Sequence, residues 1–326
     1  MSQPETPEIM ISAKGLKRTY KGRKSAVEAV RGIDLSVRRG EIVGFLGPNG
    51  AGKTTTLKML CTLLEPTAGS ATVAGIDLRA DPAGVRRRIG YVSQAGSTLG
   101  EARVGNELMD HARLYGINAQ TARARAMALL NALDLEGIWE RKCSALSGGQ
   151  RRRLDIVMGL IHEPQLVFLD EPSTGLDPQS RANLWQHIRR LRDDFGTTVF
   201  LTTHYMDEAD NLCDRILVVD HGEIVAEGTP DALKKRVSGD AVTLTLASPE
   251  EVARAGGLAG ALPGAADVVA EGSTVRLHLP DGGAALPGLF RLLDQHGLTA
   301  IGVEVKRPTL DDVFLTLTGR SLRDAA

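Results

Sequence analysis

The sequence predicts an α/β protein with a mostly parallel sheet, followed by a small α+β domain. Short apolar runs typical of buried strands alternate with helical segments through most of the chain. A helical block at about residues 100–162 interrupts this alternation. Past Ser238 the composition shifts toward Ala, Gly and Val. We therefore expect one domain over residues 1–237 and a second over residues 238–326.

The most informative segment is a glycine-rich loop between a strand and a helix. Residues 41–46 form a short apolar run that predicts a buried parallel strand, and residues 55–64 predict a helix. The loop between them fits the phosphate-binding pattern G-x-x-x-x-G-K-[ST], whose glycines let backbone N–H groups surround an anion. We expect Lys53 to reach the β- and γ-phosphates and Thr54 to ligate Mg²⁺. The phosphate-binding candidates are Gly47, Pro48, Asn49, Gly50, Ala51, Gly52, Lys53, Thr54 and Thr55.

Two further strand candidates end in side chains suited to phosphate chemistry. Residues 166–170 form an apolar run that ends in Asp170, which we expect to hold hydrated Mg²⁺. Glu171 follows directly and is the candidate general base, or at least the residue that orients the attacking water. The alternative is that these carboxylates only cap a strand. His204 follows the apolar run 198–203, at the strand end where α/β sheets place ligands.

A second glycine-rich stretch, Leu146-Ser-Gly-Gly-Gln150, precedes a predicted helix with apolar residues at 154, 157, 158 and 161. Its serine hydroxyl and backbone N–H groups would form another anion-binding helix end. Arg151, Arg152 and Arg153 follow it. We interpret them as a solvated helix face rather than a nucleic-acid contact, because the net charge is −1 and no aromatic residues are interleaved.

Residues 9–237 resemble the nucleotide-binding subunits of ABC transporters, and Leu146-Ser-Gly-Gly-Gln150 equals the signature sequence of that family. The resemblance implies an ATPase with a P-loop core, in which a parallel sheet is joined by an antiparallel β subdomain and a helical subdomain. It implies ATP as the substrate and Mg²⁺ as the cofactor. The candidate catalytic residues are then Glu171, His204, Lys53 and Gln94, and the candidate metal ligands are Thr54, Gln94 and, through water, Asp170.

The same resemblance assigns roles to the remaining motifs. Tyr20 is expected to stack on adenine, and Gln94 is expected to sense Mg²⁺ and the γ-phosphate. In the family, two copies pack head to tail with ATP between them. Residues Ser147, Gly148, Gly149 and Gln150 of one copy cover the nucleotide held by the other, and the loop at Asp177 touches the opposite subunit.

The second domain reads as strand 243–246, a helix from Ser248, strands 266–270 and 274–279, a helix over 284–296 and strand 300–306. This βαββαβ order predicts a ferredoxin-like domain. A capped helix over 308–319 ends the chain, and its Leu310-Asp-Asp-Val-Phe314 resembles the daunorubicin/doxorubicin-resistance exporter ATPases. That helix either packs on its own domain or steadies the dimer or the membrane partner.

Composition is consistent with a peripheral subunit. The three cysteines are far apart and lack metal-ligand spacing, which favours free thiols in a reducing compartment. We find no signal region and no apolar run near the ~20 residues that cross a bilayer. We therefore expect a location at the cytoplasmic face of the membrane, bound to a separate transmembrane permease.

The combined reading is the ATP-hydrolysing subunit of an ABC exporter, with a hydrophobic, drug-like cargo suggested by the subfamily resemblance. One alternative is a soluble ABC ATPase that acts on ribosomes or DNA. The single cassette and the lack of a long heptad repeat disfavour it. Another alternative, a module that binds ATP without hydrolysing it, is disfavoured by Glu171 and His204. We expect no nucleic-acid partner.

Overall fold

The computed structural model describes residues 9–22, 26–237 and 239–319, which divide into two units. The first unit ends at Thr229 and the second begins at Pro230. The change in composition that suggested a boundary after residue 237 therefore lies inside the second unit. Helix α8 (Pro230–Lys234) belongs to that unit because it packs against the last helix, α11 (Leu310–Thr318).

A six-stranded sheet forms the centre of the first unit, with the strand order β10-β9-β3-β8-β7-β6. Its neighbouring strands are parallel except for the hairpin between β9 and β10. All residues of β3, β7 and β8 are buried, as their apolar sequences predicted. The bounds are β3 (Ile42–Leu46), β6 (Ile89–Val92), β7 (Leu166–Asp170), β8 (Thr198–Thr203), β9 (Arg215–Asp220) and β10 (Glu223–Gly228).

A four-stranded antiparallel sheet shares the core of this unit. Its order is β2-β1-β4-β5, with the bounds β1 (Ile9–Lys21), β2 (Ala26–Arg38), β4 (Ala68–Val73) and β5 (Ile76–Asp77). The strand-like segments on both sides of Gly32 in the sequence predict a turn at this residue. In the structure β2 instead continues through it. Gly32 has φ of +113° and lies at an irregularity in the register between β1 and β2, so it forms a bulge.

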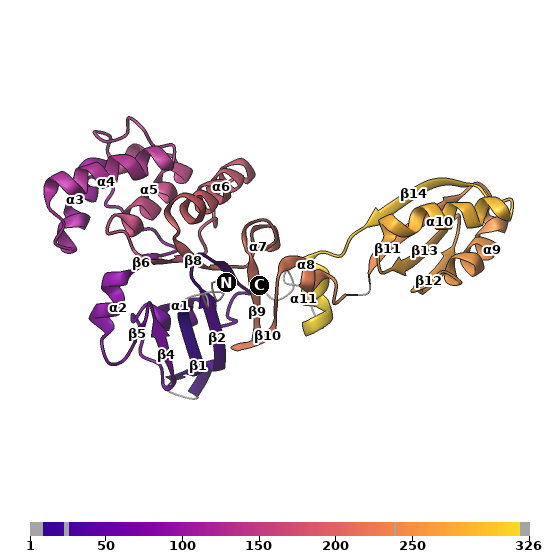
Figure 1. Cartoon of the computed structure of the whole chain (residues 1–326), viewed down its shortest axis with the longest axis horizontal. Helices are drawn as coiled ribbons and strands as arrows, with labels where there is room; N and C mark the ends of the chain where they lie inside the picture. Colours follow the sequence, from indigo (N-terminus) through magenta and orange to yellow (C-terminus); the bar gives the residue numbers. More distant parts are fainter. Residues whose placement is uncertain (1–8, 23–25, 238, 320–326) are drawn as a thin grey trace, which may run out of the picture. The chain divides into compact units, whose positions relative to one another are not determined.

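The helical subdomain is confirmed as a lobe built mainly from α3, α4 and α5 (Figure 1). Polar side chains cap several helices of the first unit, as Asn118 does for α4 and Asp177 for α6. The helices of the first unit are α1 (Lys53–Leu60), α2 (Pro82–Arg88), α3 (Val104–Leu114), α4 (Ala119–Ala132), α5 (Gly148–Leu160), α6 (Pro178–Phe195) and α7 (Met206–Leu212).

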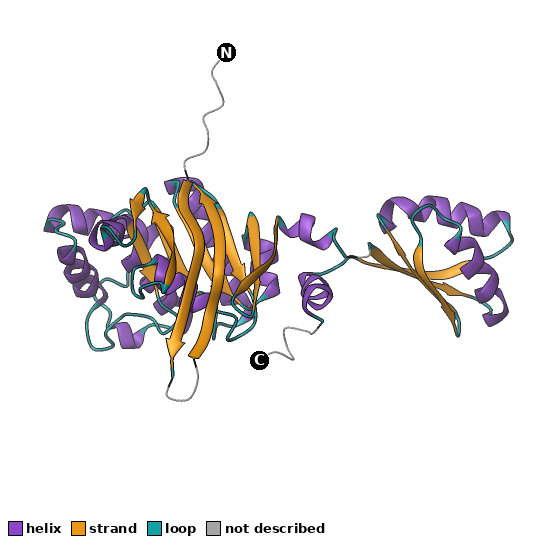
Figure 2. Cartoon of the chain, turned by 90° about the horizontal axis from the view of Figure 1, so that it is seen from below, coloured by secondary structure: helices purple, strands orange, loops and turns teal. Residues whose placement is uncertain are grey.

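The second unit contains the expected βαββαβ order and a sheet of order β12-β13-β11-β14. Figure 2 shows the strands of this unit in orange and the helices that pack on them in purple. All its strand pairs are antiparallel, which confirms the ferredoxin-like arrangement. Alternate residues of β11 and β13 are buried against the helices, as period-2 patterning requires. The bounds are β11 (Asp240–Leu246), α9 (Pro249–Gly260), β12 (Ala266–Glu271), β13 (Thr274–Leu279), α10 (Gly282–Gln295) and β14 (Ala300–Lys306).

Helix α11 begins where the sequence predicted a cap, with Thr309 and Asp312 forming a reciprocal capping box. Its residues Leu310, Val313 and Phe314 are buried. Among the described residues, no helix combines the length and the hydropathy that a bilayer crossing requires.

Candidate active site

The glycine-rich loop joins the carboxyl end of β3 to the start of α1 and is closely packed from behind. A Cβ added to Gly47 would collide with the carbonyl oxygen of Val219, and one added to Gly52 would collide with that of Ala29. Gly52 also has φ of +97°, which favours glycine. These positions therefore tolerate no side chain, and the backbone N–H groups of the loop can curve around an anion.

Lys53 is buried at the first position of α1. Its ammonium donates hydrogen bonds to the carbonyl oxygens of Gly47 at 2.7 Å and Pro48 at 3.0 Å. It also lies 3.5 Å from Oε1 of Glu171. Burial lowers the pKa of Lys53, and the Glu171 carboxylate opposes that shift. The loop therefore carries a desolvated cation at its centre.

Thr54 and Asp170 form the oxygen-rich part of the site. The Thr54 hydroxyl donates to Oδ1 of Asp170 at 3.0 Å, and the Thr202 hydroxyl donates to the same oxygen at 2.7 Å. A hydroxyl and a carboxylate are ligands that Mg²⁺ accepts. Within the described ranges no cluster of three or more His, Cys, Asp or Glu side chains could hold a metal alone. This donor set fits Mg²⁺, which commonly takes only one or two carboxylates from protein and its other ligands from water and phosphate.

Glu171 is the point at which the candidate catalytic residues meet. Its Oε2 accepts a hydrogen bond from Nε2 of Gln94 at 3.0 Å and lies 3.3 Å from Nδ1 of His204. The latter is a close electrostatic approach without hydrogen-bond alignment, since that nitrogen has no hydrogen-bond partner. The Thr174 hydroxyl donates to the same oxygen at 3.1 Å. Lys53, Gln94 and His204, the other three catalytic candidates, therefore surround the Glu171 carboxylate.

Electrostatics favour the ionised form of this carboxylate. Burial opposes ionisation of Glu171, but the nearby His204 and the positive charge of Lys53 outweigh it and lower its pKa. The backbone of Glu171 has φ of +45°, which is uncommon for a residue other than glycine. Its N–H group donates to both the carbonyl and the hydroxyl of Thr202, at 3.1 and 3.0 Å. Strand β8 thus restrains a strained residue at the end of β7.

The sequence interpretation of Arg152 is wrong, because this side chain is buried rather than solvated. Only 7% of it is exposed, whereas its neighbour Arg151 is exposed. Its guanidinium donates to the carbonyl oxygens of Ser93, Asp170 and Pro172. Ile156, one helical turn after Arg152, is also buried, but three successive arginines give the local sequence the pattern of an exposed basic face.

The second glycine-rich stretch begins α5. Ser147 caps this helix in a box with Gln150, in which each side chain accepts a hydrogen bond from the backbone N–H of the other. Ser147 and Gly148 are exposed, and Gly149 lies beside Ser180 of α6. No hydrogen bond or ion pair among the described residues joins this stretch to the loop at Lys53. The exposed N-terminus of α5 is available to another molecule.

The other candidate contacts lie at surface positions. Tyr20 on β1 pairs with Val27 of β2 and is 40% exposed, and the Arg18 guanidinium lies 4.9 Å from its ring centre. Strand β2 reaches the glycine loop at Ala29, so Tyr20 lies on the strand beside it. Asp177 caps α6 and accepts hydrogen bonds from Ser180. Both side chains present an exposed surface.

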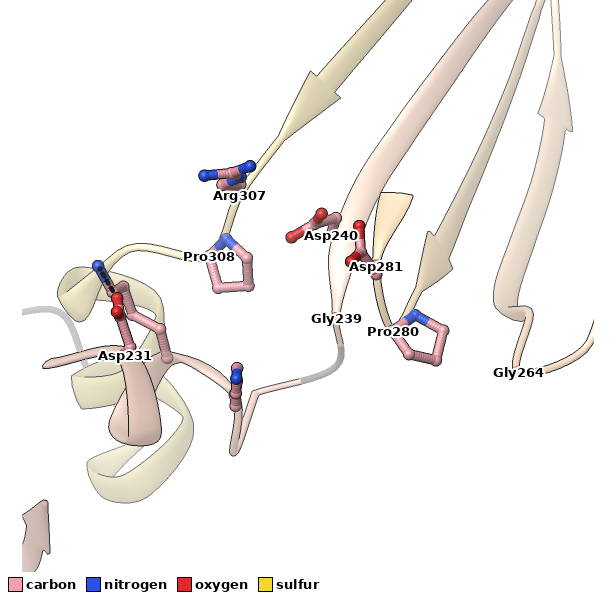
Figure 3. A pocket seen from close by; sticks show the side chains of 10 residues that line it. Asp231, Gly239, Asp240, Gly264, Pro280, Asp281, Arg307 and Pro308 are labelled. Atoms are coloured by element: carbon pink, nitrogen blue, oxygen red, sulfur yellow. Dashed lines mark ion pairs between the residues drawn. The ribbon is translucent and has the colours of Figure 1, made fainter. Parts of the chain in front are cut away.

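A cavity with none of these residues in its lining lies elsewhere in the molecule. It has a volume of about 740 Å³ and lies in the second unit, between the turn of Gly239, the loop at Pro280 and the segment at Pro308 (Figure 3). Its charged lining is partly neutralised, as in the 3.2 Å ion pair between Lys234 and Asp231. The groups suited to phosphate chemistry converge around Glu171 and not in this cavity.

Comparison with known families gives two matches that together span most of the chain. Residues 30–174 match the family model described as ABC transporter. Residues 228–318 match the model described as ATP-binding protein DrrA1-3-like, C-terminal domain.

Similar curated proteins are aligned over nearly their full length. The daunorubicin resistance ATP-binding protein DrrA3 of Streptomyces coeruleorubidus is 43% identical, with 98% of this chain and 99% of the relative aligned. The doxorubicin resistance ATP-binding protein DrrA of Mycobacterium tuberculosis is 39% identical, with 95% and 94% aligned. The Nod factor export ATP-binding protein I of Ralstonia nicotianae is 36% identical, with 99% of each chain aligned.

Solved structures resemble the first unit. The dimeric structure of MJ0796, a bacterial ABC transporter cassette, is 28% identical, with a TM-score of 0.61. It covers 68% of this chain, and 98% of that cassette is matched. A post-hydrolysis state of the same cassette, bound to ADP and Pi, matches equally well. The structure of cbiO1 from Clostridium perfringens has a TM-score of 0.63, at 25% identity, and covers 69% of this chain and 90% of its own.

Proposed function

This chain belongs to the ATP-binding subunits of ABC transporters and is the ATPase of an exporter, and from that premise we propose which of its residues carry the chemistry. The observation that supports the assignment is the meeting of Lys53, Gln94 and His204 at the Glu171 carboxylate. This cluster stands at the carboxyl ends of the parallel strands β7 and β8, beside the glycine loop after β3, where open α/β sheets bind ligands.

ATP binds with its phosphates in the loop of residues 47–55. The backbone N–H groups of the loop and the N-terminus of α1 stabilise the negative charge of the phosphates, and the Lys53 ammonium contacts the β- and γ-phosphates. Lys53 then exchanges its hydrogen bonds to Gly47 and Pro48 for bonds to phosphate oxygens. Tyr20 stacks on the adenine, which suits a half-exposed aromatic ring on the strand beside the loop.

Glu171 orients the attacking water and accepts its proton. Its lowered pKa keeps the carboxylate ionised at neutral pH, as a base must be. His204 and Gln94 contact the same carboxylate, and they turn toward the γ-phosphate and the water when ATP is bound. The oxygen of this water forms a bond to the γ-phosphorus while the bond between the γ-phosphorus and the bridging oxygen breaks, and ADP and phosphate leave.

Thr54, Gln94 and Asp170 would hold Mg²⁺, with Asp170 acting through a water molecule. The ion supplies positive charge that offsets the charge developing on the phosphate oxygens. Thr202 keeps Asp170 in place through its 2.7 Å hydrogen bond. Thr54 follows Lys53 directly in the chain, and both residues lie at the N-terminus of α1. The metal and the phosphates would therefore bind at the same helix end.

Two copies of the chain pack head to tail around two ATP molecules. Ser147, Gly148 and Gly149 at the exposed start of α5 cover the nucleotide held by Lys53 of the other copy. Asp177 lies at the same interface. The capping box supports this role, because it fixes the helix end whose remaining N–H groups receive the γ-phosphate. Loss of that phosphate lets the copies separate.

The dimer works at the cytoplasmic face of a membrane, bound to a separate permease that contains the transport path. The helical lobe contacts the permease, and Gln94 couples the presence of the γ-phosphate to the position of that contact surface. Relatives named for daunorubicin, doxorubicin and Nod factor favour export over an action on ribosomes or DNA. We propose that the exported substrate is a hydrophobic, drug-like compound.

Phosphate release by the purified full-length chain tests the assignment. We expect Glu171→Gln to lower turnover by about 100-fold or more, because it removes the base while keeping the shape of the side chain. Binding of a fluorescent ATP analogue should persist. Glu140→Gln is the matched control, since this exposed carboxylate pairs with Arg103 at 3.0 Å and, among the described residues, has no hydrogen bond or ion pair with the candidate site residues. Turnover above half of wild type in Glu171→Gln would remove Glu171 from the mechanism.

A further inference from the structure

We propose that Arg152 is a positioning residue for ATP hydrolysis, which fixes the Glu171 backbone relative to the Gln94 loop. This inference rests on the proposed roles of Glu171 and Gln94 and assigns a further residue to the same reaction. Arg152 contacts neither residue's side chain. Its guanidinium donates to the carbonyl oxygens of Asp170 at 3.0 Å and Pro172 at 2.8 Å, which flank Glu171. It also donates to the carbonyl oxygen of Ser93, which precedes Gln94.

This arrangement addresses the backbone strain at Glu171. A glutamate with φ of +45° persists only when its surroundings hold it there. Strand β8 holds the N–H group of Glu171 through Thr202. Arg152 holds the carbonyl groups on both sides, so the carboxylate is aimed from three backbone points. The guanidinium is buried and forms no ion pair within the described part of the chain, so carbonyl groups and more distant acidic residues compensate its charge.

The same helix provides a second hold on the Gln94 loop. Asp155, one turn after Arg152 on α5, accepts hydrogen bonds from the N–H group of Ser97 at 2.9 Å and from its hydroxyl at 3.3 Å. Gln94 therefore lies between two segments held by α5. The N-terminus of α5, at Ser147, covers the nucleotide of a second copy in the proposed dimer. Through Arg152 and Asp155, the same helix is hydrogen-bonded to the segments around Glu171 and Gln94 in its own copy.

Lysine cannot reproduce these contacts. The planar guanidinium presents donors in a fixed fork that reaches three carbonyl groups, whereas an ammonium on a flexible stem is a single point charge. Arg152→Lys thus preserves the charge and most of the length but loses the geometry. The role predicts a loss in the chemical step with little change in nucleotide binding, because Lys53 and the glycine loop are not contacted by Arg152.

Steady-state phosphate release by the full-length chain tests this inference. We expect Arg152→Lys to lower kcat by about tenfold or more, with KM for ATP within about twofold of wild type. Arg153→Lys is the control on the same helix, since Arg153 donates to the carbonyl of Leu133 in the helical lobe and should retain wild-type kcat. Arg152→Met, which lacks the charge, gives a second measurement and should lose at least as much kcat as Arg152→Lys.

A double-mutant cycle with Gln94→Ala separates positioning from general destabilisation. If Arg152 acts through the Gln94–Glu171 contact, the double variant should be little slower than the slower single variant. Fully multiplicative losses, or a parallel loss of nucleotide binding and folding, would overturn the inference. Unchanged kcat in both Arg152 variants, with an active wild type, would overturn it and leave the proposed function intact. A wild-type chain that releases no phosphate would overturn the proposed function itself.

Discussion

Asp170 and Glu171 are adjacent carboxylates that the structure places in different surroundings. Asp170 accepts hydroxyl hydrogen bonds from Thr54 and Thr202, whereas Glu171 lies among Lys53, Gln94 and His204. The former environment suits a metal-associated carboxylate, and the latter suits a base. The sequence predicted both roles because the two carboxylates stand at the end of an apolar strand, in a chain that also contains a phosphate-binding glycine loop.

Asp170→Asn should separate metal dependence from nucleotide binding. The amide keeps the size of the side chain but removes the charge that favours Mg²⁺. We expect the Mg²⁺ concentration for half-maximal phosphate release to rise by about tenfold or more. Asp110→Asn, at an exposed ion pair with Arg113, serves as the control. An unchanged Mg²⁺ titration in Asp170→Asn would show that this carboxylate does not hold the ion.

Arg152 shows why one positioning residue could not be predicted from sequence. Residue type and local spacing describe a basic patch equally well, because Arg151 is exposed and Arg153 half-buried on the same turn. What distinguishes Arg152 is the set of carbonyl groups around it, and these come from two segments distant in sequence. Only tertiary packing brings those segments together.

At the scale of elements, local sequence patterns predicted the helices and strands correctly wherever the structure of a segment depends mainly on its own residues. Strand β3, the glycine loop and α1 were predicted together, and so were the capped helix α11 and the βαββαβ order. The turn at Gly32 was wrong because the outcome depends on pairing: β1 and β2 continue past it and absorb the glycine as a bulge. The predicted helix after the glycine loop also ends earlier, at Leu60.

His162, just beyond α5, links the helical lobe to the main sheet. Its ring stacks on Tyr115 with centroids 3.8 Å apart, and its Nε2 donates to the carbonyl of Ile89 at 2.9 Å. Burial lowers the pKa of His162 from 6.5 to about 4, and the nearby His111 and Arg125 contribute in the same direction. The folded protein therefore keeps this imidazole neutral.

This pKa predicts a pH-dependent stability. As the pH falls below 6.5, His162 becomes protonated in the unfolded chain, whereas in the folded chain it stays neutral until about pH 4. The free energy of unfolding therefore decreases as the pH falls across that interval. His162→Gln should remove this part of the pH dependence. Thermal unfolding at about pH 7.5 and about pH 5 should show a smaller fall in Tm for the variant. Equal falls in Tm would contradict the assignment.

Helix α11 has a buried face against α8 and an exposed face that includes Leu315 and Leu317. We expect deletion of residues 308–326 to weaken retention of the chain at membranes while nucleotide binding persists. Leu315→Glu with Leu317→Glu should have the same effect, because it leaves the buried face in place. Membrane fractionation measures both variants. Unchanged retention in both would mean that the helix serves only its own domain.

At the scale of the whole molecule, the nucleotide site that we propose requires parts from two copies of the chain. The glycine loop and Glu171 lie together, but the exposed Ser147 stretch makes no hydrogen bond or ion pair with that loop among the described residues. The family resemblance, and not the local pattern, led to the expectation of a partner copy. A single chain cannot reveal the orientation of that partner, because the contact forms between molecules.

The molecular mass of the Glu171→Gln variant in solution, as monomer or dimer, tests most directly whether two copies share the nucleotide site. With ATP and Mg²⁺, this slow variant should accumulate as a dimer in analytical ultracentrifugation, and it should be monomeric without nucleotide. Adding Ser147→Arg should abolish the dimer while each copy still binds ATP at Lys53. A Glu171→Gln chain that stays monomeric at saturating ATP and Mg²⁺, or one that dimerises equally well with Ser147→Arg, would contradict a site shared between two copies.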